Sequence, residues 1–278
     1  ACLSLCQDVQ GETFDYPEEF FKERIHNIRR PRPDDFQIKQ AVEKIKNSKK
    51  PIIISGGGVF YSDAMDELGN FAIKHNIPVT QTVMGYSTMK KDHSHFVGPI
   101  GGLGGKAANN LAKETDLAIC IGTKLADFTT GSWANFENPE FKLVSINIAR
   151  HDANKHLAEA VIGDAKVTLT ELSNAIGDWK SSDSWHKKSQ VELKSWNEYV
   201  DKESGPTNQE LPSYAHAVGA IYRNSDPTDI AVTAAGGLVG EVVQVWRPKE
   251  LNTHETEWGF SCMSYEISGA LGIKMANP

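Results

Sequence analysis

The stretch Pro51–Gly58, Pro-Ile-Ile-Ile-Ser-Gly-Gly-Gly, constrains the fold of this chain more than any other. Consecutive β-branched residues suit a strand that is covered on both faces, and glycine allows a sharp turn where a Cβ would clash. Ser62 and Asp63 are placed to cap a helix, because apolar residues then recur at helical spacing up to Ile73. The stretch therefore predicts the first strand, turn and helix of a parallel sheet.

The residues after Asp34 alternate between helical and strand patterns. The expected helices span 36–48, 62–75, 104–115 and 165–178, and the expected strands span 51–55, 77–82, 116–121, 142–147 and 159–162. This alternation predicts an α/β fold, a Rossmann-like parallel sheet with helices on both faces. Glycine clusters at Gly56–Gly58, Gly101–Gly105 and Gly122 follow strand ends, the edge where such folds place ligands.

The flanking segments read as partial domains. Residues 1–6 alternate like a strand, and the prolines from Pro31 to Pro33 mark a boundary. A charged, solvated helix is expected up to Glu203. A helix at 213–222, a strand at 230–233, a helix ending near Trp246 and a last helix from Ser264 follow. Because one strand does not make a sheet, we expect the chain to be a piece of a longer protein. The predicted units are residues 1–34, 35–180, 181–210 and 211–278.

Composition narrows the classes of partner. The 278 residues carry a formal net charge of -7 with acidic and basic residues interspersed, so neither nucleic acid nor an anionic membrane is an expected partner. There is no apolar run of about 20 residues and no leader-like start. Four cysteines lack metal-binding spacing, and Cys120 is expected to be a buried small hydrophobe. A small-molecule partner and a cytoplasmic location are therefore expected.

A nucleotide site at the first glycine turn has an incomplete motif. Gly56 and Gly58 fit the first two glycines of G-x-G-x-x-G, but Tyr61 occupies the third place. The next strand ends in Gln81-Thr82, where a dinucleotide fold has an acid for the ribose. The pattern favours a structural turn, and a non-catalytic nucleotide-binding module remains an alternative.

Histidines provide two further candidates. His93 and His95 alternate as two metal ligands could, but no third ligand lies at useful spacing, which favours a solvated loop. The group His151, Asp152 and His156 follows a strand end and is expected to cap the next turn. Motifs of serine hydrolases, zinc proteases and P-loop proteins are absent from the sequence.

The segment Trp258–Met275 is different, because small residues crowd a strand-to-helix turn that contains one methionine. Together with Cys6-Gln-Asp-Val-Gln-Gly-Glu, Arg30-Pro-Arg-Pro and Gly163-Asp164, it resembles the thiamine-diphosphate enzymes of the acetohydroxyacid synthase and pyruvate oxidase group. The resemblance covers essentially the whole chain. It implies that residues 1–34 end a pyrimidine-binding domain and its linker, that 35–180 form the central domain, and that 211–278 begin a diphosphate-binding domain.

The resemblance also implies which residues would touch the cofactor. Met263 matches the apolar residue over which the cofactor bends, and the carbonyl of Ser261 would accept a hydrogen bond from the aminopyrimidine. Gly237 and Leu238 match the active-site loop close to the thiazolium. No catalytic residue is expected within the chain itself.

Departures and absences accompany this assignment. Ser261 and Ser264 stand where many relatives have glycine, and Ser268 stands where they have proline. The glutamate that acts as general acid and base is expected upstream. The Mg²⁺ ligands of a Gly-Asp-Gly…Asn motif are expected beyond Pro278, so this chain should hold no metal.

Within that group the chain is most similar to the carbon–carbon hydrolases that open a cyclic diketone to a deoxyglucuronate in inositol breakdown. The resemblance implies thiamine diphosphate and Mg²⁺ in a full-length homodimer or homotetramer, with no cofactor bound to this piece and no activity in it. FAD is not expected. The alternative within the group is an acetolactate synthase-like carboligase or a 2-oxo-acid decarboxylase, whose central domain could hold FAD.

Overall fold

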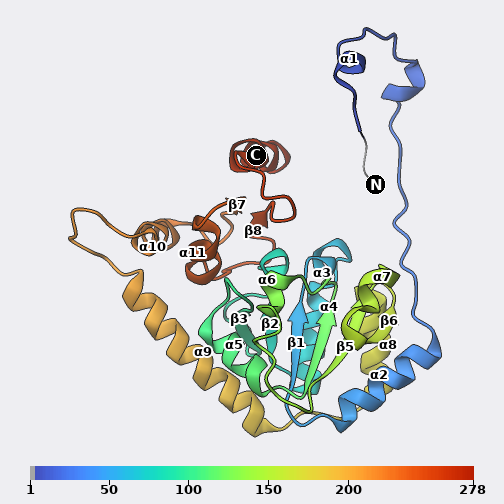
Figure 1. The fold of residues 1–278 in the computed structure, drawn as a ribbon, viewed down its shortest axis with the longest axis vertical. Coiled ribbons are helices and arrows are strands. Elements are labelled where there is room, and N and C mark those ends of the chain that lie inside the picture. The colour runs from blue at the N-terminus through green and yellow to red at the C-terminus, as the bar shows by residue number, and fades with distance from the viewer. Residues whose placement is uncertain (1–3) are drawn as a thin grey trace.

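A six-stranded parallel sheet forms the centre of the molecule (Figure 1), whose computed structural model describes residues 4–278. The strands follow the order β3-β2-β1-β4-β5-β6. They are β1 (Pro51–Ser55), β2 (Val79–Gln81), β3 (Phe96–Pro99), β4 (Leu117–Ile121), β5 (Lys142–Asn147) and β6 (Glu159–Ile162). The central strand β1 places Ile53 opposite Val79 on one side and Ile119 on the other. The α/β fold predicted from the alternation is confirmed.

Helices cover both faces of this sheet and enclose two apolar clusters. The first face is covered by α2 (Asp35–Asn47), α4 (Met65–His75) and α8 (Ala165–Ile176), and the second by α5 (Lys106–Glu114) and α9 (Asp183–Glu203). Cys120 is fully buried within the second cluster, as predicted, and burial raises the pKa of its thiol. The side chains of β1 therefore pack on helices above and below, which explains its run of isoleucines.

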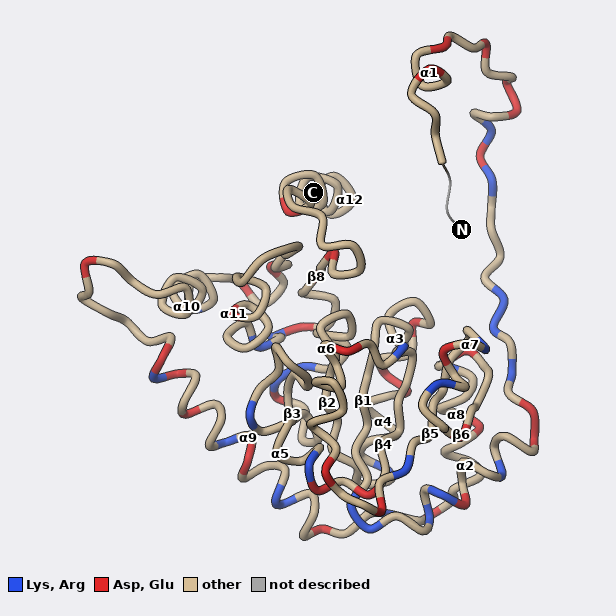
Figure 2. Tube along the Cα trace, in the orientation of Figure 1, with Lys and Arg blue, Asp and Glu red and all other residues tan. Residues whose placement is uncertain are grey.

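Shorter elements connect these layers and extend from them. In the N-terminal and central parts they are α1 (Gln7–Gln10), η1 (Glu18–Phe21), α3 (Gly58–Tyr61), η2 (Val83–Gly85), α6 (Asp127–Thr130), α7 (Arg150–Ala153) and η3 (Lys155–Leu157). The C-terminal part contains α10 (Tyr214–Asn224), β7 (Ala231–Thr233), α11 (Leu238–Val245), β8 (His254–Thr256) and α12 (Tyr265–Ala276). Acidic and basic residues are interspersed along the trace, as Figure 2 shows.

The first glycine turn is shaped by close packing between two loops. An added Cβ would lie 2.5 Å from the carbonyl oxygen of Gly122 if it were on Gly56, and 2.6 Å from the Cα of Gly122 if it were on Gly58. Gly122 itself has a φ of +61°. Backbone from the loop after β4 therefore fills the space where side chains would be, which gives these glycines a structural reason.

The predicted cap at Ser62 and Asp63 is wrong. The helix that was expected from residue 62 begins only at Met65, as α4 with Ala64 as its N-cap, and a separate short helix, α3, ends at Tyr61. Ser62 and Asp63 instead contact the start of α8: the Ala165 amide donates to Ser62 Oγ at 3.3 Å, and Lys166 pairs with Asp63 at 3.0 Å. These two polar side chains therefore connect the loop before α4 to α8 and do not cap a helix.

The expectation that helix α9 is a solvated linker is also wrong, because one side of the helix is buried. Its residues Trp185, Ser189, Leu193 and Val200 are buried, and the indole of Trp185 donates to the Pro51 carbonyl at 2.8 Å. The charged residues on its other faces dominate the composition and conceal this buried stripe.

Strands were also mispredicted at the edges. β3 was missed because Gly98 and Pro99 interrupt its pattern, which an edge strand tolerates. The strand expected at residues 1–6 lies partly outside the described residues, and residues 4–6 form none. A second strand, β8, pairs in parallel with β7, so the expected lone C-terminal strand is wrong. β8 has only three residues, too few for a period to be recognised.

Candidate functional site

The two segments that the resemblance assigns to the cofactor follow adjacent parallel strands. Ala231 of β7 pairs with His254 of β8, and Thr233 pairs with Thr256. The turn with Gly237 and Leu238 comes after β7, and the turn with Ser261 and Met263 comes after β8. Because the carboxyl ends of parallel strands share one edge, the register brings both turns to the same edge of this two-stranded sheet.

The turn after β7 offers open backbone and an exposed apolar side chain. Gly236 has a φ of +84°, and an added Cβ on Gly236 or Gly237 would meet nothing within 4 Å. Gly237 is the N-cap of α11, and Leu238 begins this helix with 46% of its side chain exposed. A ligand could therefore approach the backbone of this turn without a steric barrier.

The turn after β8 is folded by one carboxylate. Glu257 accepts hydrogen bonds from the amides of Phe260, at 2.9 Å, and Cys262, at 2.7 Å. The Cys262 and Phe260 amides hold the pKa of the Glu257 carboxyl below its usual value. These bonds fix the backbone around Ser261, and Met263 leaves the turn 83% exposed.

Ser261 and Ser264 both have left-handed backbone, with φ of +54° and +76°. An L-residue pays for this conformation in steric strain, whereas glycine does not. The turn therefore has a shape that suits glycine at Ser261 and Ser264, two of the three positions where the resemblance led us to expect a departure. Although both residues are serine, their backbone has the left-handed conformation that glycine favours.

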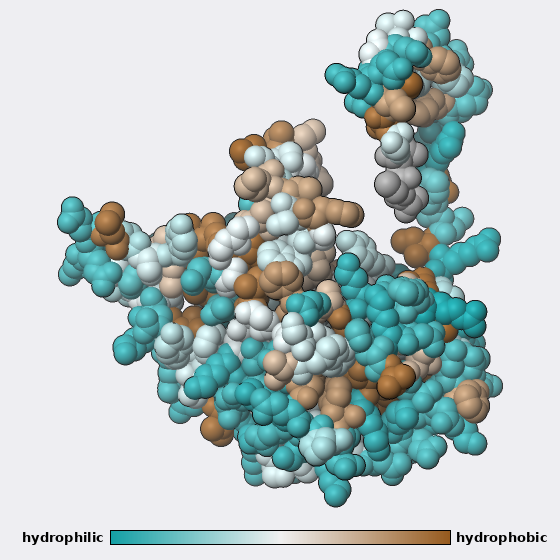
Figure 3. All heavy atoms as spheres, viewed as in Figure 1, coloured by the Kyte–Doolittle hydropathy of each residue, from teal (hydrophilic) through white to brown (hydrophobic). Residues whose placement is uncertain are grey.

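Helix α12 leaves its apolar side chains uncovered. None of its residues is buried, and Ile267, Leu271 and Met275 continue a stripe that starts at Met263. Figure 3 shows the brown, apolar atoms of this region at the top of the body. Met263 is therefore not part of a buried core among the described residues.

The same edge lies over the loops of the large sheet (Figure 1). Trp258 packs edge-to-face on Phe128 of α6, with ring centroids 4.9 Å apart. Val239 and Val243 of α11 pack with Val83 of η2. Sequence reasoning did not connect Phe128 or Val83 with this region, because their positions carry no motif and only the tertiary contact reveals them.

A buried polar group also lies at this junction. The His254 amide donates to Ser87 Oγ at 3.2 Å, and its ring packs edge-to-face on Tyr86 at 5.4 Å. Among the described residues, His254 Nε2 and the Tyr86 hydroxyl have no hydrogen-bond partner. Burial lowers the pKa of His254 to about 4 and raises that of Tyr86, so both side chains stay neutral at pH 7.

The other histidine candidates have structural contacts. His95 is buried rather than solvated, bonds to Asn76 Oδ1 at 3.1 Å and stacks on His186 at 4.2 Å. Over residues 4–278, no group of three His, Cys, Asp or Glu side chains is arranged to hold a metal ion. His95 lies in a loop, as predicted, but the expectation that it is solvated was wrong, because Asn76 and His186, distant in sequence, supply a buried environment.

The group after β5 does not cap a turn as predicted. His151 and Asp152 lie within α7, whose N-cap is Ala149 without a side-chain hydrogen bond. Asp152 pairs with Lys155 at 2.5 Å. His156 has a φ of +61° and packs on Trp133 with ring centroids 4.6 Å apart.

No described helix is both long enough and apolar enough to cross a membrane.

Comparison with known proteins connects these observations. Residues 38–172 match the family described as "Thiamine pyrophosphate enzyme, central domain". A 3D-(3,5/4)-trihydroxycyclohexane-1,2-dione hydrolase of Clostridium perfringens is 37% identical over 300 residues, covering 100% of this chain and 47% of its own length. Proteins with the same name are 36% identical in Geobacillus thermodenitrificans, over 99% of this chain and 46% of theirs, and 39% identical in Bacillus anthracis, over 99% and 47%. The chain thus spans about half the length of these relatives.

Proposed function

We propose that this chain, whose residues 38–172 match the central domain of thiamine pyrophosphate enzymes, is part of an enzyme that hydrolyses a trihydroxycyclohexane-1,2-dione. The observation that carries the proposal is similarity along the entire chain to dione hydrolases. The product would be an open-chain deoxyglucuronate, as expected for inositol breakdown in the cytoplasm. We keep the units 1–34, 35–180, 181–210 and 211–278 as the proposed domain organisation.

The two turns at the edge of β7 and β8 fit a thiamine diphosphate molecule. Gly237 offers uncovered backbone, Leu238 and Met263 offer exposed apolar side chains, and Ser261 has the left-handed backbone of a tight turn. We assign the thiazolium side to Gly237 and Leu238, the bend to Met263, and the aminopyrimidine to the Ser261 carbonyl. Bound thiamine diphosphate supplies an electron sink for cleaving the bond next to a carbonyl.

The chain's own residues position and enclose this site. The Glu257 carboxylate holds the Phe260 and Cys262 amides and so keeps the Ser261 carbonyl in one place. Val239 and Val243 anchor α11 on Val83, which fixes the turn at Gly237. The exposed stripe on α12 from Met263 to Met275 is the face on which a second subunit would exclude water, in agreement with a homodimer or homotetramer.

In this proposal the general acid and base is a glutamate upstream, and Mg²⁺ is bound by residues downstream. Loss of a general acid or base costs about 10²- to 10⁴-fold in rate, and loss of the metal removes the charge that balances a diphosphate. We therefore expect no activity and no tight cofactor binding from the 278 residues alone.

Two measurements test the proposal. Titration calorimetry of the 278-residue chain with Mg²⁺ and thiamine diphosphate should give no binding heat, and tight binding would contradict the division of the site. The full-length protein with the same additions should open the dione ring. A full-length protein that ignores the dione and decarboxylates pyruvate would instead support the decarboxylase or carboligase alternative, and a yellow colour from FAD would point the same way.

A further inference from the structure

The N-terminal segment joins the central α/β body at four consecutive residues, Arg30 to Pro33, which contact the loop before α4, the turn before α8 and α8 itself. Residues 4–29 are exposed throughout, Arg30 is the first residue that is partly buried, and Pro33 is buried. In Figure 1 the preceding segment extends away from the body. Within residues 4–278, the buried contacts of this N-terminal segment with the body therefore begin at Arg30.

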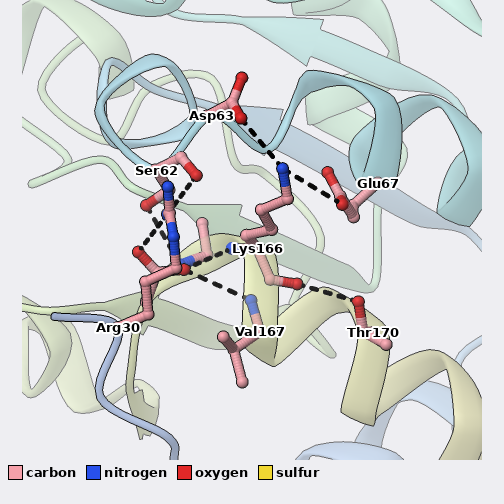
Figure 4. A network of polar contacts seen from close by, with 9 residues as sticks. Arg30, Ser62, Asp63, Glu67, Lys166, Val167 and Thr170 are labelled. Carbon is pink, nitrogen blue, oxygen red and sulfur yellow. Dashed lines mark hydrogen bonds and ion pairs between the residues drawn. The ribbon is translucent and has the colours of Figure 1, made fainter. Parts of the chain in front are cut away.

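Arg30 makes the central contact, shown in Figure 4. Its Nη1 donates to Asp164 Oδ2 at 3.0 Å and also to the carbonyl oxygen of Ser62. The Asp164 side chain is 5% exposed, and that of Arg30 is 28% exposed. One guanidinium thus joins the loop before α4 to the turn before α8.

Asp164 has further partners that fix its position. Its Oδ1 accepts from the amides of Lys166, at 3.0 Å, and Val167, at 3.3 Å, which caps α8. Its own amide donates to the carbonyl of Pro31 at 2.8 Å. Asp164 is therefore bonded to the attachment through both its side chain and its backbone.

Steric contacts complete the attachment. An added Cβ on Gly163 would lie 2.8 Å from Pro33 Cδ and 2.7 Å from Thr168 Oγ1, so the chain can pass here only over a glycine. The prolines at 31 and 33 restrict φ on either side of Arg32, which pairs with Glu171. Nearby, Lys166 pairs with Asp63 at 3.0 Å and with Glu67 at 3.7 Å.

We propose that the ion pair between Arg30 and Asp164, called the clamp below, sets the direction in which the polypeptide before residue 30 leaves the central α/β body. Arg30 is then a positioning residue for whatever that polypeptide carries. The proposal rests on the proposed function in one respect: that function identifies the preceding polypeptide as the domain that carries the catalytic glutamate. Misplacement of a reacting group by about 1 Å can cost about 10²-fold in rate, so such a clamp affects catalysis from a distance.

Arg30→Ala in the full-length protein tests the clamp by two readouts. The first is the distance distribution between spin labels at Glu12→Cys and Lys39→Cys, measured by pulsed electron resonance after replacement of Cys2, Cys6 and Cys262 by serine. We expect Arg30→Ala to broaden this distribution. The second is turnover of the dione at saturating cofactor, which should fall about 10- to 100-fold in kcat while KM stays within about threefold.

The controls separate orientation from general damage. Arg29→Ala removes the same charge from the exposed neighbouring residue and should change neither readout. Arg30→Lys retains the charge without the fork and should restore part of kcat. If Arg30→Ala fails to fold, Asp164→Asn serves instead, because asparagine still caps α8.

The outcomes are distinct. A wild-type distance distribution in a folded Arg30→Ala protein overturns the clamp. A broadened distribution with unchanged kcat overturns the positioning role of Arg30. If even the wild-type protein does not act on the dione, the proposed function fails, and the distance measurement still decides whether the clamp exists.

Discussion

Folding lowers the pKa of two buried histidines, His254 and His95. His254 and His95 are each 5% exposed, and burial lowers the pKa of both to about 4. The neighbouring rings of His186 and His93 lower the pKa of His95 further by charge repulsion. Both histidines are therefore neutral in the folded protein over a range in which the unfolded chain binds protons.

This difference predicts loss of stability in mild acid. The histidines' contribution is fully present above about pH 6.5 and is lost as the pH falls toward 4, because only the unfolded state is protonated in that window. Each histidine contributes up to about 1.4 kcal/mol per pH unit to the slope. Urea unfolding at several pH values between 4 and 7 measures it.

His254→Phe should flatten that slope while it keeps the ring contact with Tyr86, since His254 Nε2 has no partner among the described residues. His26→Gln, at an exposed histidine, serves as the control and should leave the slope unchanged. An equal slope in the wild-type and His254→Phe proteins would show that the buried ring does not titrate on unfolding.

At the scale of elements, the strand–turn–helix of β1 and α3 depends on its contact with the loop after β4. Gly58→Ala would place a Cβ 2.6 Å from the backbone of Gly122. We expect a loss of about 1–3 kcal/mol in the free energy of unfolding, the usual cost of overpacking. Gly102→Ala is the matched control, because its Cβ would lie 3.8 Å from the nearest atom. Chemical denaturation of both variants measures the difference, and equal stability would disprove the close approach.

The elements also show where sequence patterns fail. β1, β5 and β6 were predicted with the bounds that the structure has, and of these only β1 is buried along its whole length. α9 was expected as a helix, but not its buried side, since Trp185 and Leu193 are separated by charged residues. Ser62 and Asp63 have the chemistry of a cap and are used instead to bind α8. Local pattern cannot distinguish these uses.

The whole molecule combines a packed body with an exposed arm. The aromatic residues Phe14, Tyr16, Phe20 and Phe21 contact one another but stay 58% to 72% exposed. Because residues 4–29 contribute no buried residue, their removal should not lower the melting temperature of the body.

Limited trypsin digestion of the 278-residue chain tests this division. We expect the first cuts after Lys22, Arg24 and Arg29, since Arg30 and Arg32 precede proline and form ion pairs with Asp164 and Glu171. Mass spectrometry identifies the product, and its thermal unfolding should match that of the intact chain. Loss of the arm at the same rate as the body would mean that the arm packs on it.

The sequence by itself determined the parallel sheet, its covering helices and the resemblance to thiamine-diphosphate enzymes, because burial on both faces and tight turns impose local residue choices. The assignment of Gly237, Leu238, Ser261 and Met263 came from that resemblance and remains a proposal. Only the tertiary structure decided that the turns after β7 and β8 share an edge. It also showed that Gly58 packs against Gly122 and that Arg30 donates a hydrogen bond to Asp164. Local sequence patterns do not reveal these contacts, because each joins residues far apart in the chain. The sequence Pro51–Gly58 predicts a strand and a turn. The tertiary structure shows that backbone from the loop after β4 packs against this turn.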